Sequence, residues 1–410
     1  MRKKGIVIIM IEIEDKAKCC GCCACQNACP VHCIEMIEDV EGFYYPQIDR
    51  EKCISCGKCE RVCPVLKKHH ITRKDSGLQK ENNITSECAV TDTSYIAVNK
   101  DEQIRIDSSS GGIFNLLGEY ILESHGVVFG AAFESDFTVR HIMVERKEDL
   151  WKLRGSKYVQ SQMGDTYTLV KQQLEKKTRV LFSGTPCQVA GLKEFLGKDY
   201  ENLFTVDVLC HGVPSGKVFG KYLEERKKEY RADLTAVNFR YKSTGWKKFS
   251  VRLEFDGGKE YVKRAGHDPY MQIFLSNIAL RPSCYDCQFK GTDRASDLTI
   301  GDAWGVDDYR PDMDDDKGTS IIWLHSEKGV RVFQQMEQHI SFVQDELDKI
   351  LPVWSESRKS VSPHEKREIF FAKLNKENQS VIELSKMVKP RITTRAYYKA
   401  RGILKKIVKK

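Results

Sequence analysis

Two stretches of the chain, CCGCCACQNACP at residues 19–30 and CISCGKCERVCP at residues 53–64, share one pattern of cysteines. In both stretches three cysteines are separated by two residues each, and a fourth follows after three more, directly before a proline. This spacing is typical of bacterial proteins that hold two cubane 4Fe–4S clusters. The pattern therefore predicts a small two-cluster ferredoxin domain, built by internal duplication, over residues 10–66.

In such a run the first three cysteines bind one cluster and the fourth binds the other. We therefore expect cluster one on Cys19, Cys22, Cys25 and Cys63, and cluster two on Cys53, Cys56, Cys59 and Cys29. Cys20 and Cys23 break the spacing, so we expect that they are not ligands. Zinc is the alternative metal, but all-cysteine zinc sites usually combine two CxxC pairs across a longer loop. Two complete runs that end in Cys-Pro favour iron–sulfur clusters.

The composition limits the class of protein. The chain has 410 residues, of which 16 are cysteines, and its length predicts two or three domains. Cysteines grouped in CxxC runs favour metal binding in a reducing compartment over disulfides, so we expect a cytoplasmic protein. No run approaches the roughly 18–20 apolar residues of a membrane-spanning helix. The apolar residues 5–13 are short and have no cleavage site, which indicates an edge strand rather than a signal peptide. Met10 is an alternative start, which would leave residues 1–9 outside the native protein.

The positive charge of the chain lies at its end. The formal net charge is +8, and residues 389–410 contain nine Lys or Arg and no Asp or Glu. The rest of the chain is close to neutral, which argues against a nucleic-acid partner. Apolar residues among these lysines and arginines predict one of two states, a solvated tail or peripheral contact with an anionic membrane, which would be the inner membrane surface.

The pattern after the cysteine runs is different. Residues 67–92 are polar and aperiodic, as expected of a linker. Over residues 93–345, strand-like and helix-like apolar runs alternate, which favours an α/β domain with a largely parallel sheet. Within it, residues 234–264 predict an antiparallel insertion around an Asp-Gly-Gly turn. Residues 346–410 are charged and weakly patterned, and we expect a helical basic tail. The fold class is therefore α/β, or α+β for the whole chain.

Four later cysteines form a second candidate metal site. Cys187 follows a strand-to-helix turn, Cys210 ends a strand, and Cys284 and Cys287 form a CxxC pair. Ligands collect outside the carboxyl ends of parallel strands, where Cys187 and Cys210 are expected. Four thiolates are enough for a third 4Fe–4S cluster. A redox-active CxxC pair and a small zinc site are the alternatives. Cys33 and Cys88 have no such pattern, and we interpret them as bystanders.

Candidate residues for an organic cofactor precede a predicted helix that begins near Ile113. Backbone N–H groups of a Ser-Gly turn and a helix N-terminus suit a nucleotide pyrophosphate. The alternative is an ordinary helix cap with a glycine turn. The candidates for cofactor binding are Ser109, Ser110, Gly111 and Gly112 in this turn, Lys157 beside a later glycine, and Asp302 at the end of a later strand. No GxGxxG follows a strand, so a Rossmann NAD site is not indicated.

The remaining catalytic candidate is His211, because an unperturbed histidine titrates near neutral pH, although a single histidine is more often structural. A cubane cluster passes one electron at a time, whereas most organic reductions need two. A flavin interconverts the two kinds of transfer. We therefore expect a flavin site in the α/β domain.

Six motifs together resemble those of a known family. In chain order they are SSSGGIF (108–114), RGSKY (154–158), GTPCQVAGL (184–192), CHGVP (210–214), SCYDC (283–287) and DLTIGDAWG (297–305). The chain resembles the coenzyme F420 hydrogenase/dehydrogenase beta-subunit family, which includes 7-hydroxymethyl chlorophyll a reductase and a type of divinyl chlorophyllide reductase. The resemblance implies FAD in the α/β domain, a 4Fe–4S cluster on the four later cysteines, and a flavin near Ser109–Gly112 and Lys157.

These observations together predict an iron–sulfur flavoprotein oxidoreductase. We expect single electrons from a ferredoxin-type or other redox donor to pass through 4Fe–4S clusters to FAD, and then to a small or lipid-linked organic substrate or to a deazaflavin coenzyme. The alternative is an electron-transfer subunit of a larger hydrogenase or dehydrogenase complex, which has partner subunits and no substrate of its own. A zinc-stapled binding module is a third and more distant alternative.

Overall fold

The computed structural model describes residues 11–67, 93–352, 355–376 and 378–388. The predictions made for residues 1–10, for the linker after Lys67, for Cys88 and for the tail at 389–410 lie outside these residues. None of the helices in the described part of the chain has the length and apolar character needed to cross a bilayer.

The N-terminal domain is a short hairpin with two small helices. Strand β1 (Ile34–Glu38) pairs antiparallel with β2 (Tyr44–Ile48). Helix α1 (Ala24–Ala28) follows the first cysteine run, and α2 (Lys58–Arg61) lies in the second. Buried cysteines take the place of an aliphatic core here, together with Ile11 and Ile34. A domain this small has little apolar surface to bury, so metal clusters are expected to supply much of its stability.

The second domain is built on an eight-stranded mixed sheet, which confirms the predicted fold class. The strand order is β13-β3-β12-β11-β7-β6-β4-β5. Their bounds are β3 Ser94–Asn99, β4 Val127–Phe133, β5 Val139–Val144, β6 Val180–Gly184, β7 Leu203–Val208, β11 Leu298–Asp302, β12 Ser320–Leu324 and β13 Ile340–Asp345. The neighbouring strands β4, β6, β7 and β11 are parallel to one another, and the flanking pairs are antiparallel. The carboxyl ends of these four parallel strands therefore meet at one edge, as the prediction for Cys187 and Cys210 requires.

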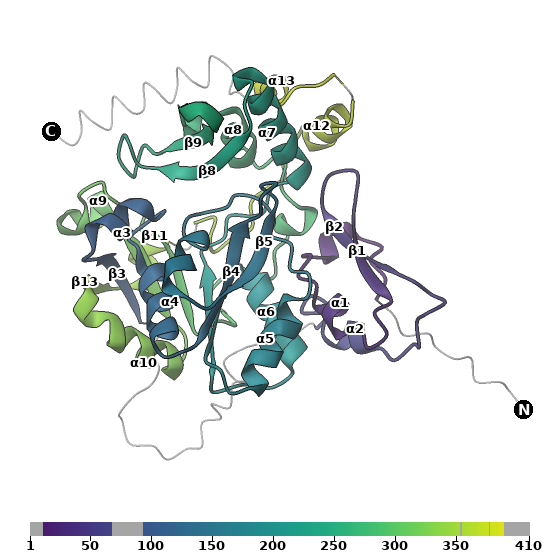
Figure 1. The fold of residues 1–410 in the computed structure, drawn as a ribbon, viewed down its shortest axis with the longest axis horizontal. Helices are drawn as coiled ribbons and strands as arrows, with labels where there is room; N and C mark the ends of the chain where they lie inside the picture. The colour runs from purple at the N-terminus through teal and green to yellow at the C-terminus, as the bar shows by residue number, and fades with distance from the viewer. Residues whose placement is uncertain (1–10, 68–92, 353–354, 377, 389–410) are drawn as a thin grey trace, which may run out of the picture.

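Helices cover both faces of this sheet (Figure 1). They are α3 Glu102–Asp107, α4 Ile113–Glu123, α5 Thr166–Glu175, α6 Pro186–Leu196, α9 Val306–Tyr309, α10 Glu327–Met336 and α11 Leu347–Ile350. Apolar residues of α4 and α10 pack on one face, and those of α5 and α6 pack on the other. Successive residues of β4 point to opposite faces, so that Val128 contacts the first layer and Phe129 the second. The ferredoxin domain lies beside α5 and α6.

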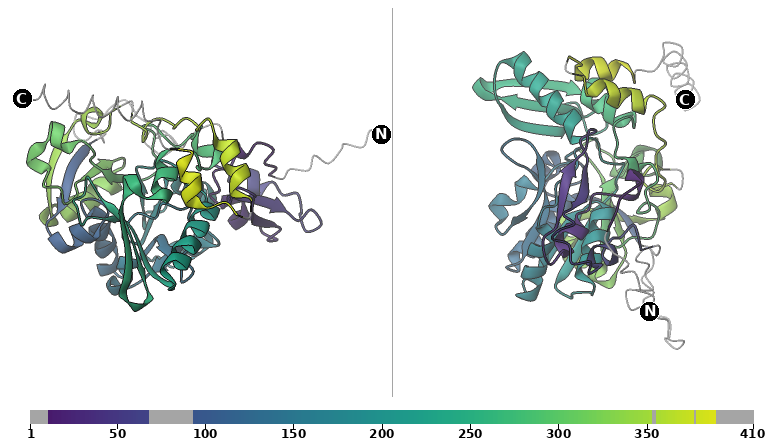
Figure 2. Two further views of the ribbon diagram at one scale, coloured as in Figure 1. Left: turned by 90° about the horizontal axis from the view of Figure 1, so that it is seen from above. Right: turned by 90° about the vertical axis from the view of Figure 1, so that its right-hand side faces the viewer.

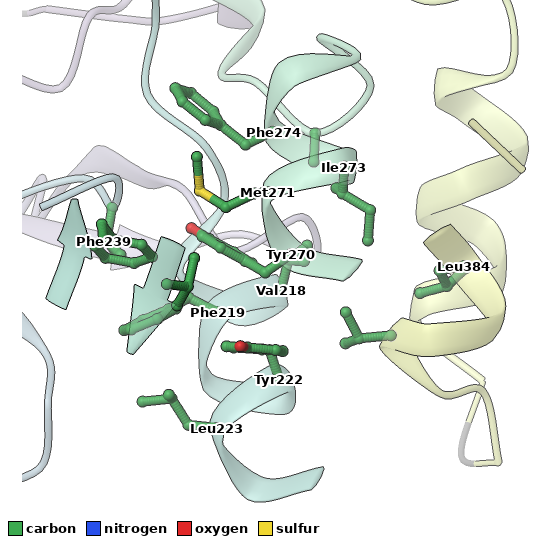
Figure 3. Packing of buried hydrophobic residues seen from close by; sticks show 14 of the residues in the cluster. Val218, Phe219, Tyr222, Leu223, Phe239, Tyr270, Met271, Ile273, Phe274 and Leu384 are labelled. Carbon is green, nitrogen blue, oxygen red and sulfur yellow. The ribbon is translucent and has the colours of Figure 1, made fainter. Parts of the chain in front are cut away.

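The antiparallel insertion has its own core. It consists of α7 (Gly216–Tyr230), β8 (Leu234–Tyr241), β9 (Ser250–Phe255), β10 (Lys259–Arg264) and α8 (Pro269–Leu275). Figure 3 shows Phe219 and Tyr222 of α7 packed between Phe239 of β8 and Tyr270 of α8, with Leu384 approaching from the C-terminal part of the chain. Leu384 belongs to α13 (Val381–Lys386), which follows α12 (Arg367–Leu374).

The segment after residue 346 is therefore partly core structure. Phe370, Phe371 and Leu384 of α12 and α13 are buried in the same cluster as α7 and α8. Figures 1 and 2 show these two helices beside the insertion, with α12 near the β1–β2 hairpin of the ferredoxin domain. Arg367 of α12 forms a bidentate ion pair with Glu41, beside the β1–β2 hairpin. Weak patterning concealed this role, because each helix is short and buries only two or three side chains.

A buried histidine next to the parallel strands predicts a pH dependence of stability. The His141 ring lies on β5, where Nδ1 is 2.7 Å from Ser161 Oγ and Nε2 is 2.9 Å from the Ser183 carbonyl oxygen. Burial lowers the pKa of His141 to about 4, whereas an unfolded histidine titrates near 6.5. The unfolded chain therefore binds the extra proton first as the pH falls. The free energy of unfolding should decrease by about 1–2 kcal/mol between pH 8 and pH 5.5 on account of this residue.

Denaturant unfolding of wild type and His141→Gln at both pH values checks this prediction. Glutamine can keep one hydrogen bond but does not titrate, so the difference between the two proteins isolates the histidine from cluster chemistry. An equal loss of stability on acidification in both proteins would rule His141 out as its source.

Candidate metal centres

The two N-terminal cysteine runs adopt the same unusual backbone conformation. Gly21 and Ser55, each directly before the second cysteine of its run, have φ of 69° and 51°. Cys23 and Gly57, each directly after that cysteine, have φ of 64° and 65°. Left-handed residues that alternate with ordinary ones curl the backbone into a concave nest whose N–H groups favour an anion such as a thiolate-bound cluster. Cys23 is therefore the conformational counterpart of Gly57 rather than a displaced ligand.

The cysteines separate into the two sets expected from the spacing. A cavity of about 310 Å³ is lined by the four predicted ligands of cluster two, Cys29, Cys53, Cys56 and Cys59. The other set, Cys19, Cys22, Cys25 and Cys63, is grouped on the side of the α/β domain, close enough for its thiols to interact electrostatically. Cys33, interpreted from the sequence as a bystander, lies next to one of the predicted ligands. Its Sγ is 3.4 Å from Cys29 Sγ.

The four later cysteines line one cavity at the carboxyl edge of the parallel strands. Its volume, open mouth included, is about 740 Å³. Cys187 lies in the first turn of α6, which a capping box between Thr185 and Gln188 fixes at the end of β6. Cys210 lies just beyond β7. Cys284 and Cys287 come from the loop after α8, and Cys284 Sγ accepts a hydrogen bond of 3.4 Å from the Val213 amide.

The donor set and the charges around this cavity fit a 4Fe–4S cluster. Burial raises the pKa of Cys284 to about 12 and also raises the pKa of Cys210, so their thiolates require a metal. Lys290 and Arg294 line the same cavity. The Arg294 side chain is 1% exposed, and its Nε and Nη1 atoms have no hydrogen-bond partner among the described residues. Its Nη1 also lies 3.8 Å from Oδ1 of the buried Asp207. The donors of this cation that make no hydrogen bond suit the negative charge of a thiolate-bound cluster. The described residues contain no group of three side chains arranged to hold a single metal ion, so the fit rests on the number of thiols and on these cations.

A fifth thiol, which the cysteine spacing predicted not to be a ligand, also lies at this cavity. Cys20 lines it, and its thiol lies close enough to Cys187 on one side and to Cys22 on the other for the two thiols of each pair to influence each other's pKa. Cys22 belongs to the cluster-one set. The two candidate centres are therefore contiguous through a single side chain. No signal in the sequence indicated this, because the contact joins two segments that are far apart in the chain.

The Ser-Gly turn predicted to bind a cofactor forms hydrogen bonds with other parts of the protein. Ser109 Oγ accepts a 2.7 Å hydrogen bond from the Ser156 amide, Ser110 Oγ donates to the Thr319 carbonyl, and the Gly111 amide donates to Ser320 Oγ. A Cβ at Gly111 would lie 2.6 Å from the Ala97 carbonyl oxygen of β3. Gly112, with φ of 82°, caps α4. The turn therefore joins SSSGGIF to RGSKY and brings the backbone against the sheet. Protein partners account for Ser110 and Gly111 without a ligand.

The other two candidates belong to polar networks nearby. Burial lowers the pKa of Lys157 to about 7, and its Nζ donates to two backbone carbonyls of its own loop. Asp302, at the end of β11, accepts a 2.7 Å hydrogen bond from Arg240 Nη1 and a 3.2 Å bond from Trp246 Nε1. Arg240 also donates to the Tyr158 hydroxyl at 3.1 Å. The motifs RGSKY and DLTIGDAWG thus meet at Arg240 of the insertion.

Comparison with known families agrees with this arrangement. A family model for the N-terminal part of the coenzyme F420 hydrogenase/dehydrogenase beta subunit matches residues 94–166, and a model for the C-terminal part of the same beta subunit matches residues 177–349. A "4Fe-4S dicluster domain" matches residues 18–66. The chain belongs to the coenzyme F420 hydrogenase/dehydrogenase beta-subunit family. It is therefore an electron-transfer component of an oxidoreductase system, and it carries a dicluster iron–sulfur domain.

This member of the beta-subunit family was also compared with solved structures and with curated proteins. The F420-reducing [NiFe] hydrogenase complex from Methanosarcina barkeri contains a similar solved chain, with 16% identity, a TM-score of 0.43, and coverage of 74% of this chain and 94% of that one. No curated protein matches the sequence.

In this member of the beta-subunit family, each nitrogen of the His211 ring contacts one side chain. Its Nε2 lies 2.6 Å from Asn277 Oδ1 and its Nδ1 lies 2.8 Å from Glu356 Oε2. Burial lowers the pKa of His211. Lys290, a residue of the cavity wall, donates to the His211 carbonyl at 3.0 Å. The histidine therefore positions the loop that carries Cys210, and a role in proton donation stays a prediction.

The contact between the two domains of this family member is close-packed. Asn27 of α1 donates to the Gly164 carbonyl and accepts from Thr168 of α5. A Cβ built on Gly191 of α6 would lie 2.9 Å from both Cβ and Sγ of Cys22. Only a glycine allows the cluster-one loop to approach α6 so closely. The interface thus places the cluster-one cysteines directly against the helix that begins with Cys187.

Proposed function

We propose that this chain is a flavin-dependent iron–sulfur oxidoreductase with three 4Fe–4S clusters and one FAD. Single electrons from a ferredoxin-type donor enter at the N-terminal domain and leave at the α/β domain, toward an organic substrate or a deazaflavin coenzyme. The observation that carries this proposal is the position of Cys20, which follows Cys19 of the cluster-one set in the chain and lines the cavity that also holds Cys187, Cys210, Cys284 and Cys287. Electron transfer from one domain to the other requires redox centres that lie close to each other.

The cysteines have distinct roles in this proposal. The eight cysteines of the two N-terminal runs hold the first two clusters. Cys187, Cys210, Cys284 and Cys287 hold the third, and Arg294 and Lys290 offset its negative charge. Pro186 at the start of α6 and the capping box behind it keep Cys187 at the edge of the sheet. The thiols therefore come from elements with fixed geometry.

FAD would bind where the motifs around Ser109, Lys157 and Asp302 meet. Two buried guanidinium nitrogens, Nε of Arg154 and Nε of Arg240, have no hydrogen-bond partner in the described residues. Unpaired buried donors in this region suit an anionic cofactor. A bound flavin would supply the conversion between one-electron and two-electron chemistry. Lys157, whose pKa is lowered by burial to about 7, can carry or release a proton near neutral pH.

The second candidate function is an electron-transfer subunit without its own substrate. The family models that match residues 94–166 and 177–349 describe beta subunits, which favours partner subunits for this chain as well. The same three clusters and flavin would then serve a partner's active site. The mass of the native protein separates the two functions, because a stable heteromer supports the second and a free chain that reduces a small acceptor supports the first.

Cofactor analysis of the anaerobically purified protein tests the proposal. We expect about 12 iron atoms, about 12 sulfides and one FAD for each chain. About eight irons would contradict the third cluster. Protein with a full iron content but no flavin would contradict the flavoprotein, and zinc in place of iron would contradict the whole relay.

A further inference from the structure

A buried arginine of the α/β domain reaches into the cluster-one loop. Arg281 has no exposed surface, and it precedes the CxxC pair of the cavity by three residues. Its Nε donates to the Cys19 carbonyl at 2.8 Å, and its Nη2 donates to the Tyr44 carbonyl at 2.9 Å. The same Nη2 lies 3.5 Å from Cys19 Sγ, and Nη1 donates to Gln160 Oε1 at 3.1 Å.

The partners of this guanidinium are unusual because none of them is a carboxylate. Its hydrogen bonds within the described residues end on two carbonyls, an amide oxygen and a thiol sulfur. Arginine stays protonated in proteins, and burying a charge without a counter-ion is costly. The rings of Tyr45 and Phe43, 4.3 and 5.7 Å away, offer only the partial negative charge of their faces. Among its hydrogen-bond partners in the described residues, the Cys19 thiolate is the one that can carry a full negative charge.

We propose that Arg281 is the counter-ion of cluster one and makes that cluster easier to reduce than cluster two. This inference rests on the proposed function, since it requires clusters on the two N-terminal sets. Uptake of one electron adds one negative charge to a cluster. A buried cation and an N–H···S hydrogen bond stabilise the reduced form more than the oxidised form, and so raise the potential.

Cluster two has a matched but exposed arginine. Arg61 Nη2 donates to the Cys56 carbonyl at 3.0 Å, and both Arg61 and Cys56 are exposed to solvent. Water and salt screen a charge in that position, so its effect on the cluster is much smaller. The two clusters therefore differ in potential, and the difference draws electrons from the exposed end of the ferredoxin domain toward the α/β domain. One electron leaves cluster two for each electron gained by cluster one.

Redox titration of the holoprotein, followed by electron paramagnetic resonance, tests this inference. In Arg281→Gln, the equilibrium constant for one-electron reduction of one N-terminal cluster should fall at least tenfold, which corresponds to about 59 mV. The other cluster should keep its potential. In Arg61→Gln, neither potential should move by a comparable amount. The iron content of both variants should equal that of wild type.

A second variant tests the inference if Arg281→Gln does not fold. Arg281→Lys keeps the positive charge but loses the fork that reaches Cys19, so the same cluster should shift in the same direction by a smaller amount. Unchanged potentials of both N-terminal clusters in the folded Arg281 variants would overturn the inference, as would an equal shift in Arg61→Gln. The inference concerns only the N-terminal clusters, so its failure leaves the flavin and the third cluster to be judged separately by the iron and flavin counts.

Discussion

Replacement of Cys210 by alanine is expected to lower the iron content from about twelve to about eight atoms for each chain. Cys210 lines the cavity beside Cys284 and Cys287, and a cluster that loses one of four thiolates in this setting is left with an open iron. The N-terminal clusters are held by other cysteines and should stay reducible. Electron transfer from a reduced ferredoxin-type donor to the flavin or to a small acceptor should therefore nearly stop, although the donor still reduces the protein.

Iron and sulfide analysis, together with the resonance spectra of the remaining clusters, measures this effect. Cys20→Ala is the matched control, because Cys20 lines the same cavity and contacts Cys187. We expect this variant to keep all the iron. If Cys20→Ala lost four irons and Cys210→Ala lost none, the assignment of the third-cluster ligands would be wrong.

Replacement of Gly191 by valine is expected to separate the ferredoxin domain from α6. Even a Cβ at this position would meet the Cβ and Sγ of Cys22 and the Tyr167 hydroxyl, each at 2.9 Å. Cys22 cannot move away without leaving the cluster-one set, so the domains themselves must shift. Overpacking of this kind costs about 1–3 kcal/mol. The thiol contact between Cys20 and Cys187, which bridges the same interface, should be lost with it.

Thermal unfolding and the rate of reduction of the flavin by a reduced donor measure the two consequences in Gly191→Val. Gly220→Ala is the control on α7, where an added Cβ meets nothing within 4 Å. Alanine is the better helix former by about 1 kcal/mol, so this control should be slightly more stable than wild type. A Gly191→Val protein with wild-type stability and wild-type electron transfer would show that the close approach of Cys22 to α6 is not needed.

Much of the ferredoxin domain could be predicted from the sequence because its ligand spacing is local. The left-handed residues that surround Cys22 and Cys56 lie within a few positions of the cysteines they arrange. The alternation of strands and helices likewise predicted the α/β domain and the insertion. The pairing of β3, β12 and β13 was not predicted, because strands joined by long connections carry no local signal of direction. The same holds for α13, which contacts α7 and α8, and for α12, which packs on α13.

The cofactor candidates illustrate the limit of motif reasoning. Ser110 and Gly111 have the residue types of an anion-binding turn, yet their polar groups reach Thr319 and Ser320. A Ser-Gly turn that binds phosphate and one that docks against a sheet have the same local sequence. The two kinds of turn differ only in what packs against them. Here that is a segment more than 200 positions further along the chain.

The sequence alone predicted the N-terminal cluster ligands and the order of the domains, and its motifs indicated the family to which the chain belongs. These properties depend on short-range spacing and on motifs in fixed order. The three-dimensional contacts were needed to show that Cys20 lines the cavity of the four later cysteines, that Arg281 lies against Cys19, and that Gly191 allows Cys22 to approach α6. Such contacts arise from the docking of one domain on another, and a docked surface brings together residues whose separation along the chain carries no information.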